Sequence, residues 1–258
     1  MKTEAKAEYS TYFYNKIFVI HNVKDVTSMR KLIHSGKMHQ KGGALAIRVL
    51  LNYCERNELM DFKEIDEIRR RIKPITEDHI DNFVPKDTHI FNSINKLNEI
   101  VDKKKLLVYR FILETSCRYT EAVHFFKNFD ESKLEIRGDV CSYDNFFNRG
   151  NKSSFYLMFS KNLYDELKPL MKKIKESDLI YLKRKSQRED DLMCIKYLRK
   201  YTYTLMLMNG IPNEIANLIS GRSNKKDVGI THYADKKELM HLHYPKILPK
   251  MNELISEI

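Results

Sequence analysis

The sequence predicts a mainly helical protein of the α+β class: a helical amino-terminal domain, followed by a larger domain that combines helices with a small antiparallel β-sheet. Three observations lead to this prediction. Apolar residues recur at helical spacing over most of the chain. Two β-like runs lie close together near its middle. Two X-Pro pairs, Lys73-Pro74 and Val84-Pro85, disfavour helix on either side of a connector near residues 74–86.

The predicted amino-terminal domain, residues 1–80, contains two helical patterns, in residues 43–56 and 60–71. Before the first pattern, Lys37 and Lys41 precede a Gly-Gly pair. Lysines at an open helix entry favour anions, so we expect these two to contact phosphate. An ordinary solvated loop is the alternative interpretation.

The predicted second domain, residues 87–258, opens with three helical patterns (88–100, 104–116 and 120–129). The strand-like runs 133–141 and 154–159 follow, separated by a turn-rich segment that contains Gly150. Helical patterns then return in residues 161–174, 191–208, 212–219 and 236–255.

Two residues mark the limits of the helix at 212–219: Pro212 suits its first turn, and Gly221 suits the position after its end. The last helix has an apolar face. It could pack on a neighbouring subunit or on its own domain.

The composition excludes several classes of protein. Lys and Arg number 46 against 35 Asp and Glu, a net charge of +11 in 258 residues, which indicates either a polyanionic partner or a solvated basic surface. No run approaches the ~18 apolar residues of a membrane span, and no signal peptide is recognisable, so we expect a cytoplasmic protein without membrane contact. The scattered cysteines, the absence of His-Glu-x-x-His and the lack of a P-loop predict no metal site and no cofactor.

Four short motifs of the second domain stand out together. They are an Arg-x-x-Glu at Arg118 and Glu121, a basic turn from Arg149 to Lys152, a Lys-x-x-Arg at Lys196 and Arg199, and Ser220-Gly221-Arg222 followed by His232-Tyr233. Each motif is two or three residues long, so their order and spacing carry the information.

In this order the motifs resemble those of the tyrosine recombinases of the phage-integrase family, and most closely the integrases of archaeal viruses and plasmids. That subgroup has Lys-x-x-Arg and Gly-Arg where the wider family has histidines. The resemblance covers residues 87–258 well. It covers residues 1–86 only loosely, as the helical core-binding domain that precedes the catalytic domain.

The chemistry of the residues agrees with this resemblance. Cleaving a DNA phosphodiester without a metal requires a nucleophile, positive charge for the phosphorane and an acid for the leaving 5′ oxygen. Arg118, Arg199 and Arg222 suit the second task, because a guanidinium binds two phosphoryl oxygens and stays protonated. Lys152 suits the acid, since burial and nearby arginines can lower a lysine pKa. Lys196 lies one helical turn before Arg199, where the resemblance places a further catalytic residue.

The remaining assignments leave alternatives open. Glu121 is interpreted as an orienting partner of Arg118. Arg149 is expected to contact DNA. Lys152 could do the same instead of acting as the acid. In that case Lys133 and Lys161 are the alternative candidates for the acid.

The resemblance assigns the nucleophile to Tyr233, which would form a 3′-phosphotyrosyl intermediate. Tyr244 is the competing candidate, whereas Tyr201 and Tyr203 are interpreted as core or edge residues.

The sequence therefore predicts a site-specific DNA recombinase that integrates or excises a mobile element and assembles as a homotetramer on double-stranded DNA. Two alternatives remain: a catalytically silent DNA-binding protein of the same fold, and a type IB topoisomerase-like enzyme that relaxes supercoils.

Overall fold

The computed structural model describes residues 27–28, 31, 47–48, 51–52, 54–58, 60–71, 81–149, 152–222 and 235–256. The chain divides into two compact units, Met1–Asp81 and Asn82–Ile258. This division falls within the connector that the sequence predicts near residues 74–86.

Unit 1 contains α4 (Phe62–Arg71), which the apolar spacing of residues 60–71 predicts. Ile65 and Ile68 are buried on one face of the helix. Arg69, one helical turn after Ile65, donates to Glu55 Oε2 at 2.5 Å and to Asn52 Oδ1 at 2.6 Å. Lys37 and Lys41 lie outside the described residues.

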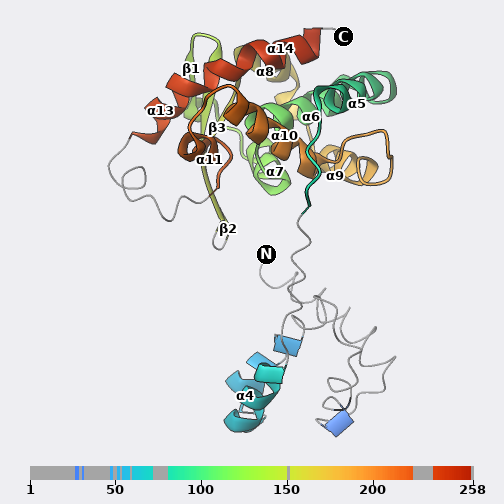
Figure 1. Ribbon diagram of the computed structural model, residues 1–258, viewed down its shortest axis with the longest axis vertical. Helices are drawn as coiled ribbons and strands as arrows, with labels where there is room; N and C mark the ends of the chain where they lie inside the picture. The colour runs from blue at the N-terminus through green and yellow to red at the C-terminus, as the bar shows by residue number, and fades with distance from the viewer. Residues whose placement is uncertain are drawn as a thin grey trace. The chain divides into compact units, whose positions relative to one another are not determined.

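Unit 2 is built mainly of helices, shown in Figure 1. The described helices are α5 (Asp87–Ile100), α6 (Lys103–Thr115), α7 (Tyr119–Lys127), α8 (Lys161–Leu167), α9 (Glu176–Lys185), α10 (Ile195–Met208), α11 (Asn213–Ile219), α13 (Lys236–His243) and α14 (Leu248–Ser256), with 3-10 turns η2 (Glu131–Lys133), η3 (Lys168–Lys173) and η4 (Tyr244–Ile247).

Helix α6 is the centre of this unit. It is buried from Leu106 to Thr115 and packs against α5, α8, α9, α10 and β3. Its Phe111 ring stacks on Phe125 of α7 at a centroid distance of 4.4 Å and meets Phe159 of β3 edge-on at 5.3 Å. Such aromatic contacts add to the stability gained from burial alone. The end of α6 is consequently held from several sides.

The sheet has three antiparallel strands in the order β1 (Leu134–Arg137), β2 (Val140–Arg149) and β3 (Lys152–Ser160). The predicted fold class, mainly helical with a small antiparallel sheet, is therefore confirmed. The expectation of one continuous strand over residues 133–141 is wrong. Gly138 adopts a φ of +55°, a conformation that glycine takes without a steric penalty, and there the chain turns back from β1 into β2.

Two helical predictions also need correction. Helix α9 was not predicted, because its sequence is dominated by charged and polar residues and only Leu179 and Leu182 of its apolar residues are buried. The single helix expected over residues 236–255 is instead α13, η4 and α14. Pro245 lies in η4, where it cannot donate the backbone hydrogen bond of a continuous α-helix.

Helices α13 and α14 pack on their own unit. Lys237 of α13 forms ion pairs with Glu135 of β1 at 2.8 Å and with Asp144 of β2 at 2.9 Å. His241 Nε2 lies 2.9 Å from Ser142 Oγ of β2. Further along, Met251 and Leu254 of α14 are buried in the core of the same unit. Of the two arrangements open for the last helix, the structure shows packing on its own domain.

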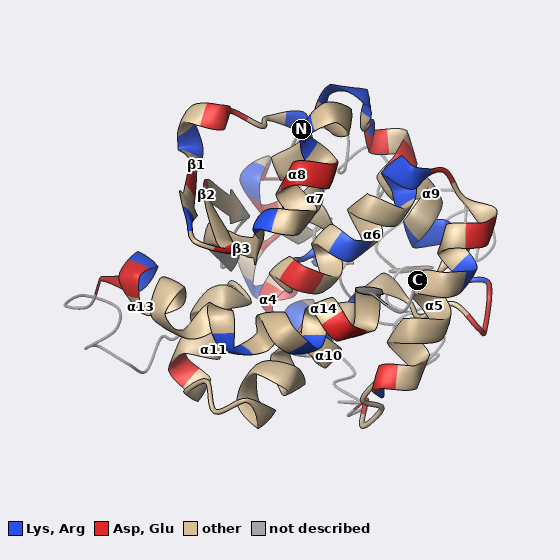
Figure 2. Ribbon diagram, turned by 90° about the horizontal axis from the view of Figure 1, so that it is seen from above, with Lys and Arg blue, Asp and Glu red and all other residues tan. Residues whose placement is uncertain are grey.

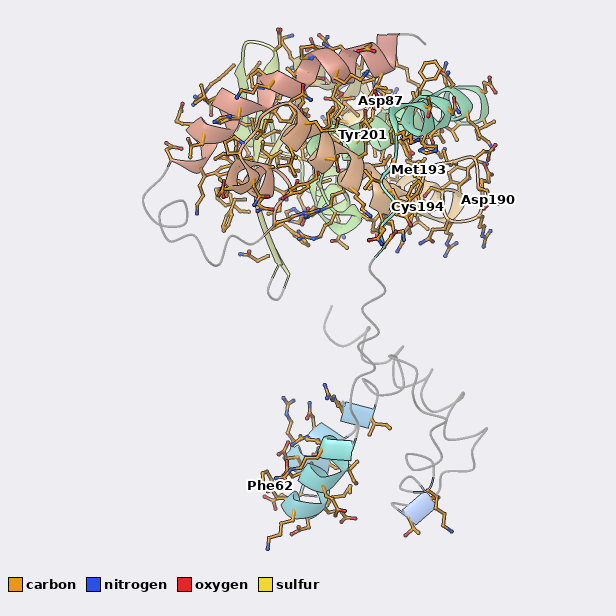
Figure 3. The ribbon with its side chains drawn as sticks, viewed as in Figure 1. Phe62, Asp87, Asp190, Met193, Cys194 and Tyr201 are labelled. Atoms are coloured by element: carbon orange, nitrogen blue, oxygen red, sulfur yellow. The ribbon has the colours of Figure 1, made fainter. Side chains whose placement is uncertain are left out.

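Polar side chains lie on the surface of unit 2, and hydrogen bonds made by side chains join its helices to one another. Figure 2 shows Lys and Arg interleaved with Asp and Glu around α8 and α9. Tyr201 of α10 donates to Asp87 Oδ1 of α5 at 2.8 Å; both residues are labelled in Figure 3. Tyr109 donates to the Met193 carbonyl, also at 2.8 Å, which joins α6 to the segment before α10. Tyr201 is thus a structural residue, as its place in the sequence indicates.

Glu114, in the last turn of α6, is a buried acid whose Oε2 accepts a hydrogen bond from the Ser160 backbone N–H at 2.8 Å. Burial raises the pKa of its carboxyl, and the hydrogen bond from Ser160 offsets part of that rise. An acid of this kind favours the folded state below its ordinary pKa of about 4.3, and this contribution is lost as pH rises through the raised value.

We therefore expect Glu114→Gln to gain stability relative to the wild type as pH rises. Glutamine keeps an acceptor for Ser160 but does not ionise. The measurement is the free energy of unfolding by urea at several pH values from about 4 to about 8. Glu166→Gln is the control with the opposite sign: although partial burial acts to raise the pKa of Glu166, Arg110 and Lys103 hold it below its ordinary value. A difference between Glu114→Gln and wild type that does not change with pH would contradict the prediction.

Candidate active site

A buried pair of serines joins the elements that surround the site. Ser116 ends α6 with a φ of +52°, a left-handed conformation that few residues other than glycine adopt. Its Oγ lies 3.0 Å from Ser220 Oγ, after α11, and donates to the Arg199 carbonyl of α10 at 3.3 Å. Both serines are buried. The ends of α6 and α11 are thereby held against α10.

Arg118 lies at the start of α7, and its backbone and side chain share one partner. Its N–H donates to Glu121 Oε2 at 2.7 Å, and its Nη1 donates to Glu121 Oε1 at 2.5 Å. The same Nη1 also donates to the carbonyl of Gly221 at 2.8 Å. Glu121 has only 2% of its side chain exposed, against 25% for Arg118. One buried carboxylate thus orients the guanidinium, the role that sequence reasoning expects of Glu121.

Arg199 projects from α10 toward the same carboxylate. Its Nη1 lies 3.9 Å from Glu121 Oε2, beyond hydrogen-bonding distance. This Nη1 is buried and makes no hydrogen bond within the part of the chain that the structure describes. Burial, together with the charges of Arg118 and Arg222, lowers the pKa of Arg199 to about 10, although Glu121 acts in the opposite direction. A buried cation with an unused donor is suited to binding an anion.

Arg222 is positioned by the end of α11. Gly221, at a φ of +58°, donates to the Leu218 carbonyl at 2.9 Å, and the Arg222 N–H donates to the Asn217 carbonyl at 2.8 Å. These two bonds form a Schellman motif, whose left-handed position favours glycine. The motif also directs the Gly221 carbonyl toward Arg118. Gly221 therefore lies after the helix end, as its place in the sequence predicts.

Tyr203, which the sequence places in the core or at its edge, contacts the Arg222 guanidinium with the face of its ring. The Arg222 guanidinium carbon lies 3.8 Å from the Tyr203 ring centre, within the range of a cation–π contact. The Tyr203 hydroxyl in turn donates to Asn213 at 2.5 Å and to Asn217 at 3.0 Å, both on α11. The ring is consequently held in place, and Arg222 remains exposed above it.

The structure brings together four of the predicted site residues: Arg118, Glu121, Arg199 and Arg222. We call these four the arginine site. It combines three guanidinium groups with one carboxylate, so its formal charge is positive. Three like charges held at one place repel each other unless an anion lies among them. The arrangement therefore suits a ligand with a multiply charged oxyanion, such as a phosphate diester or the transition state of its cleavage.

Two other predicted residues are placed by backbone alone. Arg149 ends β2 and Lys152 begins β3, and the two are paired across the strands next to the turn. Their side chains lie outside the described part of the chain.

Lys196 is exposed on α10, one turn before Arg199, and its Nζ lies 4.2 Å from the Tyr197 ring centre. Its alternatives as a catalytic or a structural residue remain open.

The two candidate nucleophiles differ in what the structure shows of them. Tyr233 belongs to residues 223–234, outside the described residues. Tyr244 is fully buried, its hydroxyl donates to the Glu114 carbonyl at 3.0 Å, and burial raises its pKa well above the ordinary value. A buried hydroxyl that is committed to the core of the unit cannot attack an external phosphate. Tyr244 is therefore a structural residue.

Sequence reasoning overlooked Ser116, Ser220 and the supporting role of Tyr203. A signal for the serines was present, because Ser-x-Arg occurs at both Ser116-Cys117-Arg118 and Ser220-Gly221-Arg222. Repetition of so short a motif has little weight until folding brings the two copies together. No comparable signal marks Tyr203 among fifteen tyrosines.

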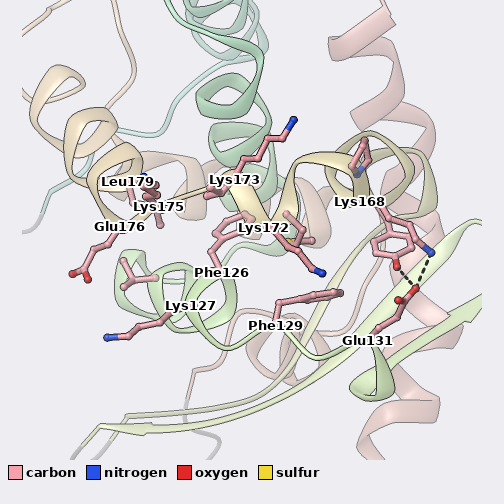
Figure 4. Close-up of a pocket in the computed structure, with 15 residues that line it drawn as sticks. Phe126, Lys127, Phe129, Glu131, Lys168, Lys172, Lys173, Lys175, Glu176 and Leu179 are labelled. Atoms are coloured by element: carbon pink, nitrogen blue, oxygen red, sulfur yellow. Dashed lines mark hydrogen bonds and ion pairs between the residues drawn. The ribbon is translucent and has the colours of Figure 1, made fainter.

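An open pocket in unit 2 is separate from the arginine site. It has a volume of about 860 Å³ and an apolar floor that includes Phe126, Phe129 and Leu179, with lysines at its rim (Figure 4). None of its lining residues belongs to the arginine site. Within the described ranges, no group of three His, Cys, Asp or Glu side chains could hold a metal ion, and no helix is long and apolar enough to cross a membrane.

Comparison with known families agrees with this geometry. The sequence model of the family described as archaeal phage integrase matches residues 82–250, which include all four residues of the arginine site. The chain belongs to the archaeal phage integrase family. The resemblance deduced from the motifs is thereby confirmed.

Two further comparisons concern solved structures and curated proteins. A solved structure of the XerH site-specific recombinase, bound to its difH substrate before cleavage, aligns with a TM-score of 0.49 and 14% sequence identity, covering 91% of this integrase-family chain and 75% of that chain. A search of curated proteins finds no match.

The Schellman motif at Gly221 yields a prediction with a matched control. Gly210 ends α10 in the same motif, at a φ of +70°, with the Ile211 N–H donating to the Met206 carbonyl. Alanine at either left-handed position should lower the free energy of unfolding by about 1 kcal/mol. Only Gly221→Ala should also weaken anion binding at the arginine site, because only the Gly221 carbonyl contacts Arg118. Urea unfolding and titration with inorganic phosphate measure the two effects, and equal loss of phosphate binding in both variants would contradict the assigned role.

Proposed function

We propose that this protein is a site-specific tyrosine recombinase that cleaves and rejoins double-stranded DNA through a 3′-phosphotyrosyl intermediate, and so integrates or excises a mobile element. The observation that carries the proposal is the arginine site. Arg118, at the start of α7, is hydrogen-bonded to buried Glu121, and Arg199 of α10 lies 3.9 Å from it with an Nη1 that makes no hydrogen bond among the described residues. Arg222, after α11, adds a third positive charge, which helps to lower the pKa of Arg199. Membership of the archaeal phage integrase family supports the same reaction.

In the proposed reaction the Tyr233 hydroxyl gives up its proton to solvent water as its oxygen attacks the scissile phosphorus. A bond from this oxygen to phosphorus forms, the bond to the 5′ oxygen breaks, and Lys152 supplies the proton that converts the leaving oxygen into a hydroxyl. The reverse attack, by the 5′-hydroxyl of another strand, releases the tyrosine. Because the phosphotyrosyl bond conserves the energy of the phosphodiester, rejoining needs no nucleotide cofactor.

The arginine site would stabilise the charge that builds up on the phosphoryl oxygens during both steps. Arg199 would contribute a partly desolvated positive charge, since its side chain is only 13% exposed and a charge acts more strongly there than in water. Arg118 is oriented by Glu121 and the Gly221 carbonyl, and Arg222 by the Tyr203 ring. Lys196 lies one turn from Arg199 and would assist at the edge of the site.

We further propose that residues 1–80 form a core-binding domain, with Lys37 and Lys41 at the DNA phosphates, that residues 87–258 form the catalytic domain, and that Arg149 contacts DNA beside Lys152. Exchange of strands between two duplexes uses four cleavage sites, so the active assembly would be a homotetramer on DNA.

Covalent trapping tests the proposed chemistry. A pool of duplexes, each nicked at its centre and randomised on both sides of the nick, is incubated with the protein in EDTA, and covalent complexes are isolated on a denaturing gel for sequencing. We expect wild type and Tyr244→Phe to form the complex and Tyr233→Phe to form none. Tyr244→Phe should still lose about 1–3 kcal/mol of stability, because the Glu114 carbonyl loses its buried donor.

Other outcomes of the trapping experiment identify the alternatives. A complex that disappears only in Tyr244→Phe would keep the reaction but overturn the nucleophile. DNA binding on native gels without any covalent complex would indicate a silent DNA-binding protein. A covalent complex that relaxes supercoils but exchanges no strands between two recovered sites would indicate a topoisomerase-like enzyme.

The pKa of Arg199 gives a second test, on the pH dependence of cleavage. Wild type, with a pKa of about 10 at this position, should keep the charge of residue 199 from about pH 7 to about pH 9, so that its own pH profile reflects other groups such as Lys152. Lysine has an ordinary pKa of about 10.4, and the same burial and the same neighbouring arginines would depress it. We therefore expect Arg199→Lys to lose its charge, and hence its cleavage rate, as pH rises over this range.

The cleavage rate of the trapped substrate, measured as a function of pH, is the readout for the Arg199 variants. Arg199→Met carries no charge at any pH and sets the lower limit. Parallel profiles for wild type and Arg199→Lys would show that the charge of residue 199 does not act in the rate-limiting step.

A further inference from the structure

The ribbon formed by β2 and β3 contains a β-bulge at Phe146. Asp144 pairs with Tyr156 and Phe147 pairs with Ser154, so that two residues of β2 lie opposite one residue of β3. Phe146 has a φ of +40° and 59% of its side chain is exposed. Figure 1 shows the ribbon extending from the body of unit 2 toward the turn between β2 and β3.

The positive φ and the exposure of the Phe146 ring each make the folded chain less stable. A bulky residue at positive φ is a steric outlier, for which glycine or asparagine would be better suited. The exposed part of the ring also lacks the stabilisation that full burial would give. Residues held in such conformations cluster at ligand-binding sites. The conformation therefore indicates that the ring acts on something outside the chain.

The neighbours of Phe146 hold it outward. Asn145, only 4% exposed, points inward, where its side chain meets His124 Nδ1 at 3.3 Å and donates to Ser154 Oγ at 3.5 Å. Phe147 packs on the His124 ring at a centroid distance of 4.7 Å. With both neighbours anchored on α7 and β3, the bulged residue between them is directed away from the body.

The surroundings of the ring combine aromatic and cationic groups. Tyr156 lies edge-on to Phe146 at a centroid distance of 6.0 Å, and Lys237 lies 5.7 Å from the Tyr156 ring centre. Lys236 lies 5.3 Å from the ring centre of Phe155, which is 42% exposed on the opposite strand. Lys237 is already paired with Glu135 and Asp144, so Lys236, beside the exposed Phe155 ring, supplies the positive charge at the ribbon. Exposed rings with a nearby cation match a partner that has flat apolar faces and negative charge. Stacked bases between phosphate chains have that character, whereas an apolar protein surface does not.

We propose that Phe146 is a DNA-contacting wedge, whose ring inserts at a base step next to the strand that is cleaved and partly unstacks it. The proposal rests on the proposed function, which supplies duplex DNA as the partner. An inserted apolar side chain disrupts stacking at the step that it enters. Unstacking at that point would ease the separation of strands that exchange requires. The strained backbone keeps the ring projected before DNA arrives.

The test compares variants of the full-length protein on one duplex, taken from the covalent selection and carrying 2-aminopurine at one position near the nick in turn. Phe146→Asn removes the ring and suits positive φ, Phe146→Ala removes the ring alone, and Phe146→Trp restores an aromatic wedge. Met208→Ala is the matched control, since Met208 is 80% exposed at the end of α10, outside the ribbon. Fluorescence of 2-aminopurine reports unstacking, anisotropy reports affinity, and urea unfolding reports stability.

We expect wild type and Met208→Ala to raise the fluorescence at one or two adjacent positions. Phe146→Asn should not raise it, should bind about tenfold more weakly, and should be at least as stable as wild type. Phe146→Trp should recover the fluorescence signal.

Two results would overturn the wedge and leave the recombinase function standing: unchanged affinity and fluorescence in Phe146→Asn, or a loss of its stability that shows the ring to be packed in its own chain. Failure of wild type to bind or cleave any duplex would overturn both proposals together.

Discussion

The buried carboxylate of Glu121 is the interaction on which the arginine site depends. Arg118 and Arg199 approach it from two different elements, and without an anion between them their guanidinium groups would repel each other in a partly desolvated place. Glu121 lies in the first turn of α7, where a negative charge is favoured by the helix dipole. Its hydrogen bond from the Arg118 N–H also caps that helix. The Glu121 side chain thus caps the start of α7, orients Arg118 and offsets the charge of Arg199.

The scaffold around this carboxylate is rigid where the chemistry requires it. Helix α6 is buried along most of its length, and the Ser116–Ser220 contact ties its end to the end of α11. The Schellman motif at Gly221 then sets both the carbonyl that receives Arg118 and the backbone of Arg222. Each arginine is supported by groups that are themselves held by packing or hydrogen bonds, which is what precise recognition of a phosphate requires.

Local backbone strain in unit 2 coincides with these functional features. Among its described residues, the non-glycine residues with positive φ are Ser116, at the centre of the arginine site, and Phe146, on the ribbon. Strain of this kind persists only where the surrounding contacts determine it. At Ser116 the contacts are internal and explain the conformation. At Phe146 the ring touches Tyr156 but stays largely exposed, which is consistent with the external partner proposed for it.

Local patterns in the sequence were sufficient to predict the class of the fold, the family and the candidate residues. Helical periodicity, turn residues such as Gly221, and the order of four short motifs are local properties, which survive without knowledge of contacts. Predictions from the sequence were wrong where local signals were ambiguous. The strand predicted over residues 133–141 is two strands joined by a turn at Gly138, and the polar helix α9 has too few buried apolar residues to be recognised. Only the tertiary structure decided that Tyr244 is a core residue, that Tyr203 supports Arg222, and that one carboxylate serves two arginines. These facts depend on contacts between residues about 20 to 130 positions apart, such as the 130-residue separation of Tyr244 from Glu114, and no local pattern encodes which distant partner a side chain will meet.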